Sequence, residues 1–302
     1  MPFKLTIIGS GSAVPIVSRG VTSQYINFNE RHMLVDCGEG TQLQLRRFKV
    51  KFQRIQMIFI SHLHGDHYLG LVGLLSSMSL LGRTKKVNLF CPPELEELLK
   101  VQFELAGINL SFDLEFNHLN PNGKMVIFQD NVIQVSSFPV KHRIPTWGFH
   151  FQEKRKEKNI DPAKIAEHKL TIEEIQTAKK GEDVVREAEY LRNEDITLPD
   201  KPLLSYAYSS DTKYFKEMAK YVKGVDLLYH EATFTEKQKD RAVKTKHSTA
   251  KEAAQVAKEA GVGKLLLGHF SARFKSTDEV LNEAKTVFDN CVCVEDGDEF
   301  IL

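Results

Sequence analysis

Cysteine is scarce in this chain of 302 residues, which carries only four thiols, at Cys37, Cys91, Cys291 and Cys293. So few cysteines exclude a small disulfide-stapled scaffold, and we expect reduced side chains that serve in packing. Long apolar runs are missing too, since no stretch of eighteen or more apolar residues occurs. Their absence excludes a membrane-spanning helix, and the lack of a basic and apolar leader makes the cytoplasm the expected location.

An excess of charge of one sign is also absent. The chain has 41 basic and 40 acidic side chains, so its net charge is only +1. This balance excludes a general attraction to phosphate, and any affinity for nucleic acid must come from a local patch. With 42% hydrophobic and 27% charged residues, the composition is that of a soluble enzyme with one or two domains.

A glycine-rich turn near the beginning of the chain lacks the third glycine of a dinucleotide-binding loop. Its sequence is Gly9-Ser10-Gly11-Ser12-Ala13-Val14, and no crossover helix follows it. The turn therefore gives little support to a nucleotide cofactor. It either closes a tight turn between strands or contacts a substrate, and both interpretations stay open.

What the chain does contain is a dense group of metal-binding side chains, His62-Leu63-His64-Gly65-Asp66-His67, directly after the apolar run 57–60. In an extended segment alternate side chains share one side, so His62 and His64 point the same way, whereas Asp66 and His67 fall in the following turn. The two pairs can then bind two adjacent metal ions, and zinc suits these ligands best. A polar loop with scattered histidines is the alternative, but crowded neutral imidazoles have no other evident partner.

Three further residues stand at the ends of predicted strands. These are His142, Asp211 and His269, which follow short apolar or strand-like runs. Strand ends on a rigid sheet can hold ligands at the short distances that zinc requires. Each residue alone would be ordinary, but together with the hexapeptide they predict a metal centre.

The pattern of apolar residues and turn signals predicts a mixture of strands and helices. We expect strands at 3–8, 23–28, 125–128 and 132–135, and helices at 40–48, 68–80, 92–106 and 249–260. The helix at 68–80 is apolar enough to face a core or a partner subunit, and burial is the default. Strands followed by helices, twice over, fit two sheets flanked by helices.

The hexapeptide resembles the HxHxDH signature of the metallo-β-lactamase superfamily, and four more motifs resemble those of its ribonuclease Z family. They are VDCGEGT at 35–41, HEAT at 230–233, HST at 247–249 and GHFSARF at 268–274, and the similarity runs nearly end to end. The resemblance implies an α/β (α+β) metallo-β-lactamase fold, a four-layer αββα sandwich. Residues 1–302 would form a single domain, with a flexible arm inserted at 152–200.

The resemblance also implies an activity: endonucleolytic removal of 3′ trailers from precursor tRNA after the discriminator base, leaving a 3′ hydroxyl. Two Zn²⁺ ions per subunit, or another divalent metal such as Mn²⁺, would serve this hydrolysis. One metal would be bound by His62, His64 and His142, the other by Asp66, His67 and His269, and Asp211 would bridge both. Members of the family are usually homodimers, so precursor tRNA and a second copy are the expected partners.

Phosphodiester hydrolysis also needs proton transfer and charge neutralisation. Asp66 is a candidate to accept a proton from the attacking water. His247 is the candidate to protonate the leaving 3′ oxygen, with Glu231 orienting it, because this step needs an imidazole or a tuned carboxylate. Arg273 and Arg143 can neutralise the phosphate, or they merely pair with nearby acids. Arg273 is the stronger candidate, since its motif matches.

Residues 152–200 depart from the pattern, because they are highly charged and contain few large apolar side chains. Little core of their own is expected, so they are predicted to protrude. In the resembled family this insertion grips tRNA and often contains a Gly-Pro motif, which is missing here, where 171–175 takes the comparable place. Candidate phosphate contacts are Lys154, Arg155, Lys156, Lys158, Lys179 and Lys180. A solvated charged hairpin without a specific role is the alternative.

Two other functions compete with RNA cleavage. One is hydrolysis of a small phosphodiester or thioester with the insertion as a lid, against which the charged composition of the insertion argues. The other is RNA binding without turnover, which the full ligand set and His247 disfavour. His32, His118, His150 and His168 lie outside every motif and are expected to be structural or surface residues.

Overall fold

The computed structural model describes residues 3–154, 157–187, 189–200 and 202–302. The chain divides into two compact units. The first contains Met1–Gln129, Gln134–Gln152 and Leu204–Leu302, and the second contains Asp130–Ile133 and Glu153–Leu203. Among the helices of the described residues, none has the length and apolar character needed to cross a bilayer.

The first sheet of the larger unit has seven strands and combines antiparallel with parallel pairing. β16, β1, β2 and β3 pair antiparallel, whereas β3, β4, β5 and β6 pair parallel. In spatial order the strands are β16 (Glu299–Ile301), β1 (Phe3–Gly9), β2 (Ser23–Phe28), β3 (Arg31–Val35), β4 (Met57–Phe59), β5 (Val87–Cys91) and β6 (Leu114–His118).

The second sheet also has seven strands and the same mixture. β12, β13, β14 and β15 pair parallel, and β9 adds to β12 antiparallel. In spatial order its strands are β15 (Cys291–Cys293), β14 (Lys264–Gly268), β13 (Leu227–Glu231), β12 (Ser205–Ser209), β9 (Trp147–Glu153), β8 (Ile133–Pro139) and β7 (Met125–Gln129). The parallel halves bring the carboxyl ends of several strands to one edge of each sheet, where loops can converge.

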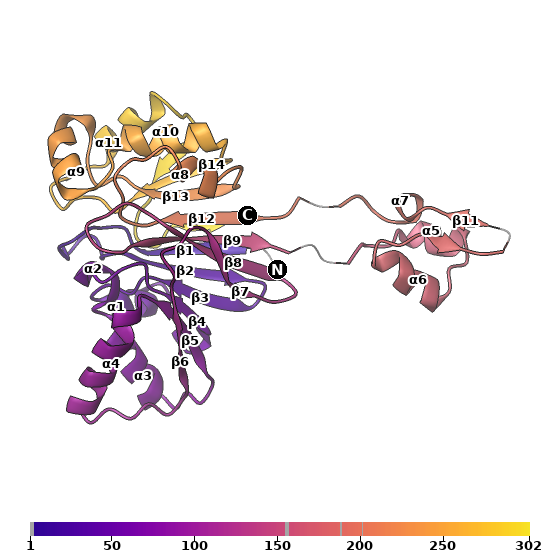
Figure 1. The fold of residues 1–302 in the computed structure, drawn as a ribbon, viewed down its shortest axis with the longest axis horizontal. Helices are drawn as coiled ribbons and strands as arrows, with labels where there is room; N and C mark the ends of the chain where they lie inside the picture. The colour runs from indigo at the N-terminus through magenta and orange to yellow at the C-terminus, as the bar shows by residue number, and fades with distance from the viewer. Residues whose placement is uncertain (1–2, 155–156, 188, 201) are drawn as a thin grey trace. The chain divides into compact units, whose positions relative to one another are not determined.

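Helices cover the outer faces of the two sheets (Figure 1). Beside the first sheet are α1 (Thr41–Arg47), η1 (Phe52–Arg54), α2 (Gly65–Tyr68), α3 (Leu71–Leu80) and α4 (Pro93–Leu105); beside the second are α8 (Met218–Tyr221), η2 (Glu236–Gln238), α9 (Lys239–Thr245), α10 (Ala250–Ala260) and α11 (Asp278–Lys285). Between the sheets aromatic rings meet, with the centroid of Phe59 5.4 Å from that of Phe149. The predicted four-layer αββα sandwich is confirmed.

Local signals explain the helix boundaries. Thr249 and Glu252 form a capping box at the start of α10, and Gly261 ends that helix in the left-handed conformation. The predicted helix at 68–80 is wrong in one respect, because α2 and α3 are separate and meet near Gly70. A Cβ on Gly70 would lie 2.1 Å from the carbonyl oxygen of Gly38, so the chain must approach the neighbouring loop closely there.

Part of the metal-binding hexapeptide is helical. Asp66 and His67, predicted to lie in a turn, belong to the short helix α2. The following helix α3 buries one face, which includes Leu71, Leu74 and Met78, so the expected burial is confirmed for that face. All four cysteines are free thiols, as predicted.

The second unit has regular structure and a small core of its own. It contains α5 (Pro162–Glu167), α6 (Ile172–Lys179), β10 (Val184–Val185), β11 (Tyr190–Leu191) and α7 (Asn193–Ile196). Its buried side chains are Ile160, Leu170, Ala178, Val184, Leu191 and Ile196. The expectation of little core agrees with this small cluster, in which apolar residues that are dispersed in the sequence converge in space. The buried Asn193 amide adds hydrogen bonds to the carbonyls of Ala178 and Glu182.

Candidate metal centre and cleft

Loops after three strands bring four potential ligand atoms to one point. His64 Nδ1 lies 3.0 Å from His62 Nε2 and 3.2 Å from His142 Nε2. Asp211 Oδ2 lies 3.6 Å from His62 Nε2 and 3.7 Å from His142 Nε2. Four ligands bound to tetrahedral zinc at 2.0–2.1 Å lie about 3.3 Å from one another. The first group therefore has the spacing of a metal site.

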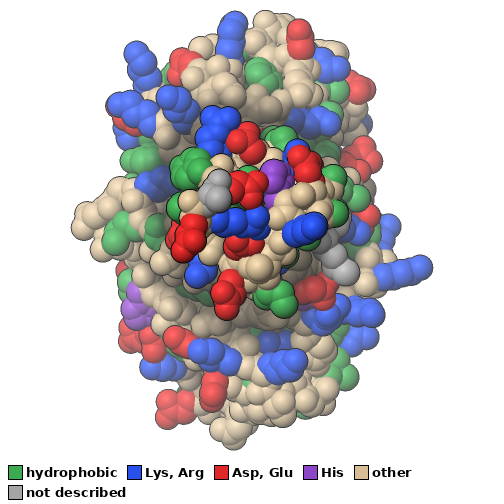
Figure 2. Space-filling view, turned by 90° about the vertical axis from the view of Figure 1, so that its right-hand side faces the viewer, with side chains coloured by type: hydrophobic (Ala, Val, Ile, Leu, Met, Phe, Trp, Pro, Cys, Tyr) green, Lys and Arg blue, Asp and Glu red, His purple; other side chains and the backbone are tan. Residues whose placement is uncertain are grey.

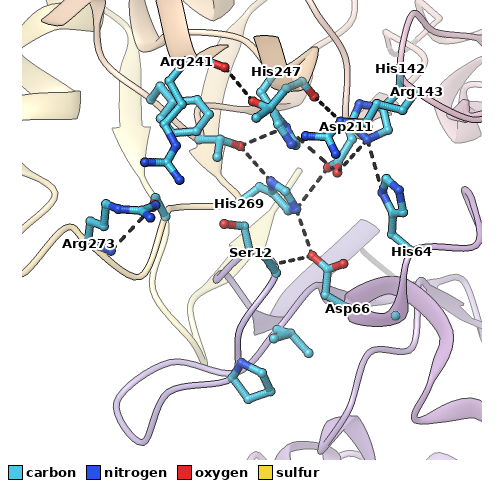
Figure 3. A pocket seen from close by; sticks show the side chains of 18 of the residues that line it. Ser12, His64, Asp66, His142, Arg143, Asp211, Arg241, His247, His269 and Arg273 are labelled. Atoms are coloured by element: carbon cyan, nitrogen blue, oxygen red, sulfur yellow. Dashed lines mark hydrogen bonds and ion pairs between the residues drawn. The ribbon is translucent and has the colours of Figure 1, made fainter. Parts of the chain in front are cut away.

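A second group of atoms adjoins the first. His269 Nε2 lies 3.3 Å from His67 Nε2 and 3.4 Å from Asp66 Oδ2. The other carboxylate oxygen of Asp211, Oδ1, lies 3.0 Å from His269 Nε2 and 3.5 Å from His67 Nε2. Asp211 thus presents one oxygen to each group, which is the arrangement of a bridging ligand (Figure 3).

The chemistry of Asp211 fits a divalent cation. Its side chain is 2% exposed, and its Oδ1 has no hydrogen-bond partner among the described residues, although His269 Nε2 is close. A buried carboxylate oxygen without a donor is costly unless a cation neutralises it. The histidine and aspartate cluster therefore fits divalent metal binding.

Electrostatics agree with this interpretation. Burial lowers the pKa of His62 to about 3 and that of His142 to about 4, so both imidazoles are neutral, as metal ligands must be. Burial alone would also lower the pKa of His67, but the carboxylates of Asp66, Asp211 and Asp36 raise it well above the usual value. The negative charge around His67 thus attracts a cation, whether a proton or a metal ion.

The ring nitrogens that face away from the cluster have hydrogen-bond acceptors. His142 Nδ1 donates to the Lys246 carbonyl over 2.9 Å, and His269 Nδ1 lies 2.8 Å from Thr233 Oγ1. His67 Nδ1 lies 2.8 Å from Asp36 Oδ2. These bonds place the proton on Nδ1 and leave the Nε2 lone pair for a metal.

Asp36 supports the centre although the sequence analysis gave it no role. At the end of β3, its carboxylate accepts hydrogen bonds from the Ser61 backbone N–H at 2.7 Å and from the Tyr208 hydroxyl at 2.6 Å. It thereby fixes the ring of His67. The VDCGEGT motif contains Asp36, so the motif was a signal, but the partner became visible only in the fold.

His247 and Glu231 form a pair beside the metal centre. His247 Nδ1 lies 2.8 Å from Glu231 Oε1, and Glu231 is fully buried. Burial lowers the pKa of His247, but the Glu231 carboxylate raises it to about 9 on balance. The Thr233 hydroxyl donates to Glu231 Oε2 over 2.7 Å. His247 with Asp211 and His269 is also a geometrically permitted metal group, so His247 could serve either as a ligand or as a proton donor.

An open cleft of about 410 Å³ lies over the two groups and is rimmed by arginines. Arg143 lies on one side of the cluster, and Arg241 and Arg273 lie on the other (Figure 3). All three are exposed, and none pairs with a carboxylate in the part of the chain that the structure describes. Arg241 was missed by the sequence analysis because it lies on α9, outside the recognised motifs.

The glycine-rich turn lies at the same cleft. The Ala13 N–H donates to Asp66 Oδ2 over 2.6 Å. Asp296 holds the longer loop that contains this turn, accepting from the Ser10 N–H at 2.9 Å and from the Gly20 N–H at 2.6 Å. The segment lines the cleft through Ser12 and Ala13, and a Cβ on Gly9 would lie 1.8 Å from the Val21 carbonyl oxygen, so both interpretations left open for it stand.

The remaining predicted residues are not among those that line the cleft or form the metal centre in the described part of the chain. Lys154 belongs to the second unit, and Arg155 and Lys156 lie outside the described residues. The four histidines expected to be structural are absent from every metal-binding group found among the described residues. His118, for example, pairs with Glu96 at 2.7 Å on the surface.

Comparisons with known proteins identify the fold of this chain. A family model for the beta-lactamase superfamily domain matches residues 200–270, and one for the anti-Pycsar protein Apyc1 matches residues 3–155. The metallo-beta-lactamase fold protein YhfI from Bacillus subtilis is 20% identical, with a TM-score of 0.70 and full coverage of both chains. The crystal structure of human tRNase Z, short form, is 26% identical, with a TM-score of 0.73 and 98% of each chain covered. The protein has the metallo-β-lactamase fold.

Full-length relatives define the family. Ribonuclease Z from Bacteroides fragilis is 42% identical over 296 residues, which are 98% of this chain and 97% of the relative. Ribonuclease Z from Cytophaga hutchinsonii is 43% identical over 304 residues, covering 100% of this chain and 97% of the relative. The chain belongs to the ribonuclease Z family and is a metal-dependent endoribonuclease.

Proposed function

We propose that this protein removes 3′ trailers from precursor tRNA with two zinc ions, by hydrolysing the phosphodiester after the discriminator base and leaving a 3′ hydroxyl. The observation that carries the proposal is the extent of the similarity. It spans 98% of the chain, whereas the family models of the wider superfamily stop at residue 155 and resume at 200. The segment that these family models leave out lies within the alignment with the ribonuclease Z relatives.

The metal ions would be held by the two groups of ligand atoms. One ion would bind His62, His64 and His142, the other would bind Asp66, His67 and His269, and Asp211 would contact both. When bound, the ions would lower the pKa of a water molecule and neutralise phosphate charge. Manganese is an alternative occupant, since it also accepts imidazole and carboxylate ligands.

The chain's own residues would move protons and hold the substrate. Asp66, positioned by the Ala13 N–H, would accept a proton from the attacking water. His247 would protonate the departing 3′ oxygen through Nε2, because Glu231 holds its Nδ1. Arg273 would neutralise the non-bridging phosphate oxygens with its guanidinium group, and Arg143 would do so from the other side of the cleft.

We propose that the second unit is an arm that binds tRNA. Its affinity must come from selected side chains, because residues 153–203 contain eleven basic and thirteen acidic residues. Several cations are already paired, such as Arg186 with Glu174 at 2.7 Å and Lys158 with Asp200 at 3.2 Å. Three lysines remain candidates: Lys154, which follows β9, and Lys179 and Lys180 at the C-terminal end of α6. Figure 2 likewise shows basic and acidic side chains interspersed on one face of the molecule.

We further propose a homodimer. A largely apolar groove of about 530 Å³ lies along α4 and includes Leu69, Leu98 and Val101. Leu105 in the same groove is 84% exposed, and contiguous exposed apolar side chains are typical of an interface. A Leu105→Lys variant should elute as a monomer in size-exclusion chromatography with light scattering, while the wild type elutes as a dimer. A monomeric wild type would contradict the proposal.

The experiment that tests the function compares two substrates. The purified protein, supplied with zinc, is assayed on a 3′-extended precursor tRNA and on bis(p-nitrophenyl) phosphate. We expect kcat/KM to be several orders of magnitude higher on the precursor, because remote contacts with the tRNA body add binding energy. Rapid turnover of the small diester without cleavage of the precursor would favour the competing function.

That competing function is hydrolysis of a small phosphodiester or thioester with the second unit as a lid. It is supported by the match of residues 3–155 to a family outside the ribonuclease Z group. The composition of the second unit disfavours it, since a lid for a small ligand usually offers apolar surface. The two-substrate comparison decides between the functions.

A further inference from the structure

A second pocket, of about 440 Å³, adjoins the cleft. Its lining includes Lys141, Arg143, Lys213 and Lys246, together with His142, one of the candidate metal ligands. His142 and Arg143 line both hollows, so the two lie side by side. We refer to this hollow as the basic pocket.

The basic pocket is strongly positive. No acidic side chain is among the described residues that line it. Lys141 lies 3.7 Å from the exposed Glu217, a pair of little energetic weight. The part of the chain that the structure describes offers no carboxylate within ion-pair distance of Arg143, Lys213 or Lys246. Four neighbouring cations repel one another, so an anionic occupant would be stabilised there.

The backbone fixes the basic pocket relative to the metal centre. Lys141 and Arg143 flank the ligand His142 in sequence, Lys213 is two residues from Asp211, and Lys246 directly precedes His247.

Hydrogen bonds join these three segments. The Lys213 N–H donates to the Lys141 carbonyl at 2.9 Å, the Lys246 ammonium to the His142 carbonyl at 3.2 Å, and Arg143 Nε to the Thr245 carbonyl at 3.3 Å. An anion in the pocket would therefore stand at a set position beside the cluster.

We propose that the basic pocket binds a backbone phosphate of the RNA that flanks the scissile phosphodiester. This inference rests on the proposed function, since an RNA strand carries phosphates at regular intervals on both sides of the cut. Lys141, Lys213 and Lys246 supply point charges for this phosphate, and Arg143, which lines both hollows, is left for the scissile phosphate. A substrate with a single phosphodiester has no second phosphate, so the pocket selects for a polynucleotide.

The test uses Lys213→Gln and, as a matched control, Lys216→Gln. Both lysines are exposed and lie three residues apart, but Lys216 does not line the pocket. With zinc-loaded protein and precursor tRNA, Lys213→Gln should raise KM about threefold to tenfold with kcat unchanged, and the salt dependence of binding should become shallower by about 0.7–0.9 in log–log slope. Turnover of bis(p-nitrophenyl) phosphate should not change, and Lys216→Gln should behave as wild type.

Trailer length identifies which phosphate is bound. If Lys213→Gln no longer raises KM for a precursor with a one-nucleotide trailer, the pocket binds a trailer phosphate. If the effect persists, it binds a phosphate on the tRNA side. Either result supports a flanking-phosphate site.

Equal behaviour of the two variants on precursor tRNA would overturn the inference, as would an equal loss of small-diester turnover in Lys213→Gln. If the wild type does not cleave precursor tRNA, the proposed function fails separately. Fluorescence anisotropy with a labelled single-stranded oligoribonucleotide then compares the same two variants, and equal affinities would overturn the phosphate site.

Discussion

Replacing His247 by alanine separates the role of proton donor from that of metal ligand. If His247 protonates the leaving 3′ oxygen, its loss should lower the single-turnover rate on precursor tRNA by about 10²–10⁴-fold. That loss corresponds to a barrier about 3–5 kcal/mol higher. The fold should tolerate the change, because the buried Glu231 carboxylate still accepts hydrogen bonds from the Thr212 N–H at 3.0 Å and the Thr233 N–H at 3.1 Å.

The leaving group provides a second readout. A p-nitrophenolate leaves without protonation, so His247→Ala should cleave bis(p-nitrophenyl) phosphate at nearly the wild-type rate. Zinc content, measured by elemental analysis, should also be unchanged, since the group of His62, His64, His142 and Asp211 and the group of Asp66, His67 and His269 are complete without His247. His118→Ala serves as the control, because His118 is a surface histidine paired with Glu96. Loss of zinc, or equal slowing on both substrates, would refute the assignment of His247 as proton donor.

Three further predictions concern residues and segments around the centre. Asp36→Asn should weaken metal affinity about 10–100-fold, as measured by chelator competition, because it removes the charged acceptor of His67; unchanged affinity would contradict this support role. Asp296→Asn should lower kcat more than it raises KM, because the turn that positions Asp66 loses its anchor, and an effect on KM alone would argue against it. Replacing 153–203 by a short Gly-Ser linker should weaken cleavage of precursor tRNA while sparing the small diester, and equal losses on both would make the segment structural.

The sequence could predict those parts of the site whose metal-binding residues are close together in the chain. His62, His64, Asp66 and His67 are adjacent in the chain, and strand ends identify further candidates. Because alternate side chains of an extended segment share one side, the sequence could predict that His62 and His64 point the same way, but not that Asp66 and His67 lie in the helix α2. The assignment of ligands to two groups came from the family resemblance, and the distances around Asp211 agree with it.

The parts that could not be predicted depend on contacts between distant segments. Asp36, which follows β3, contacts His67 in α2, and Asp296 holds a loop almost three hundred residues away. Likewise, the break near Gly70 arises because the loop at Gly38 approaches closely, which helical periodicity does not encode. The residues that form the small core of the second unit could not be identified for a similar reason, since they are dispersed and show no strong local pattern.

The most direct measurement is the position of the cut. A precursor tRNA with a 3′ trailer is incubated with metal-free protein and with zinc-reconstituted protein, and both product ends are determined at nucleotide resolution. The account predicts a single zinc-dependent cut after the discriminator base, with a 3′ hydroxyl on the tRNA and a 5′ phosphate on the trailer. A cut elsewhere, a 3′ phosphate on the tRNA, or equal cleavage by the metal-free protein would contradict it.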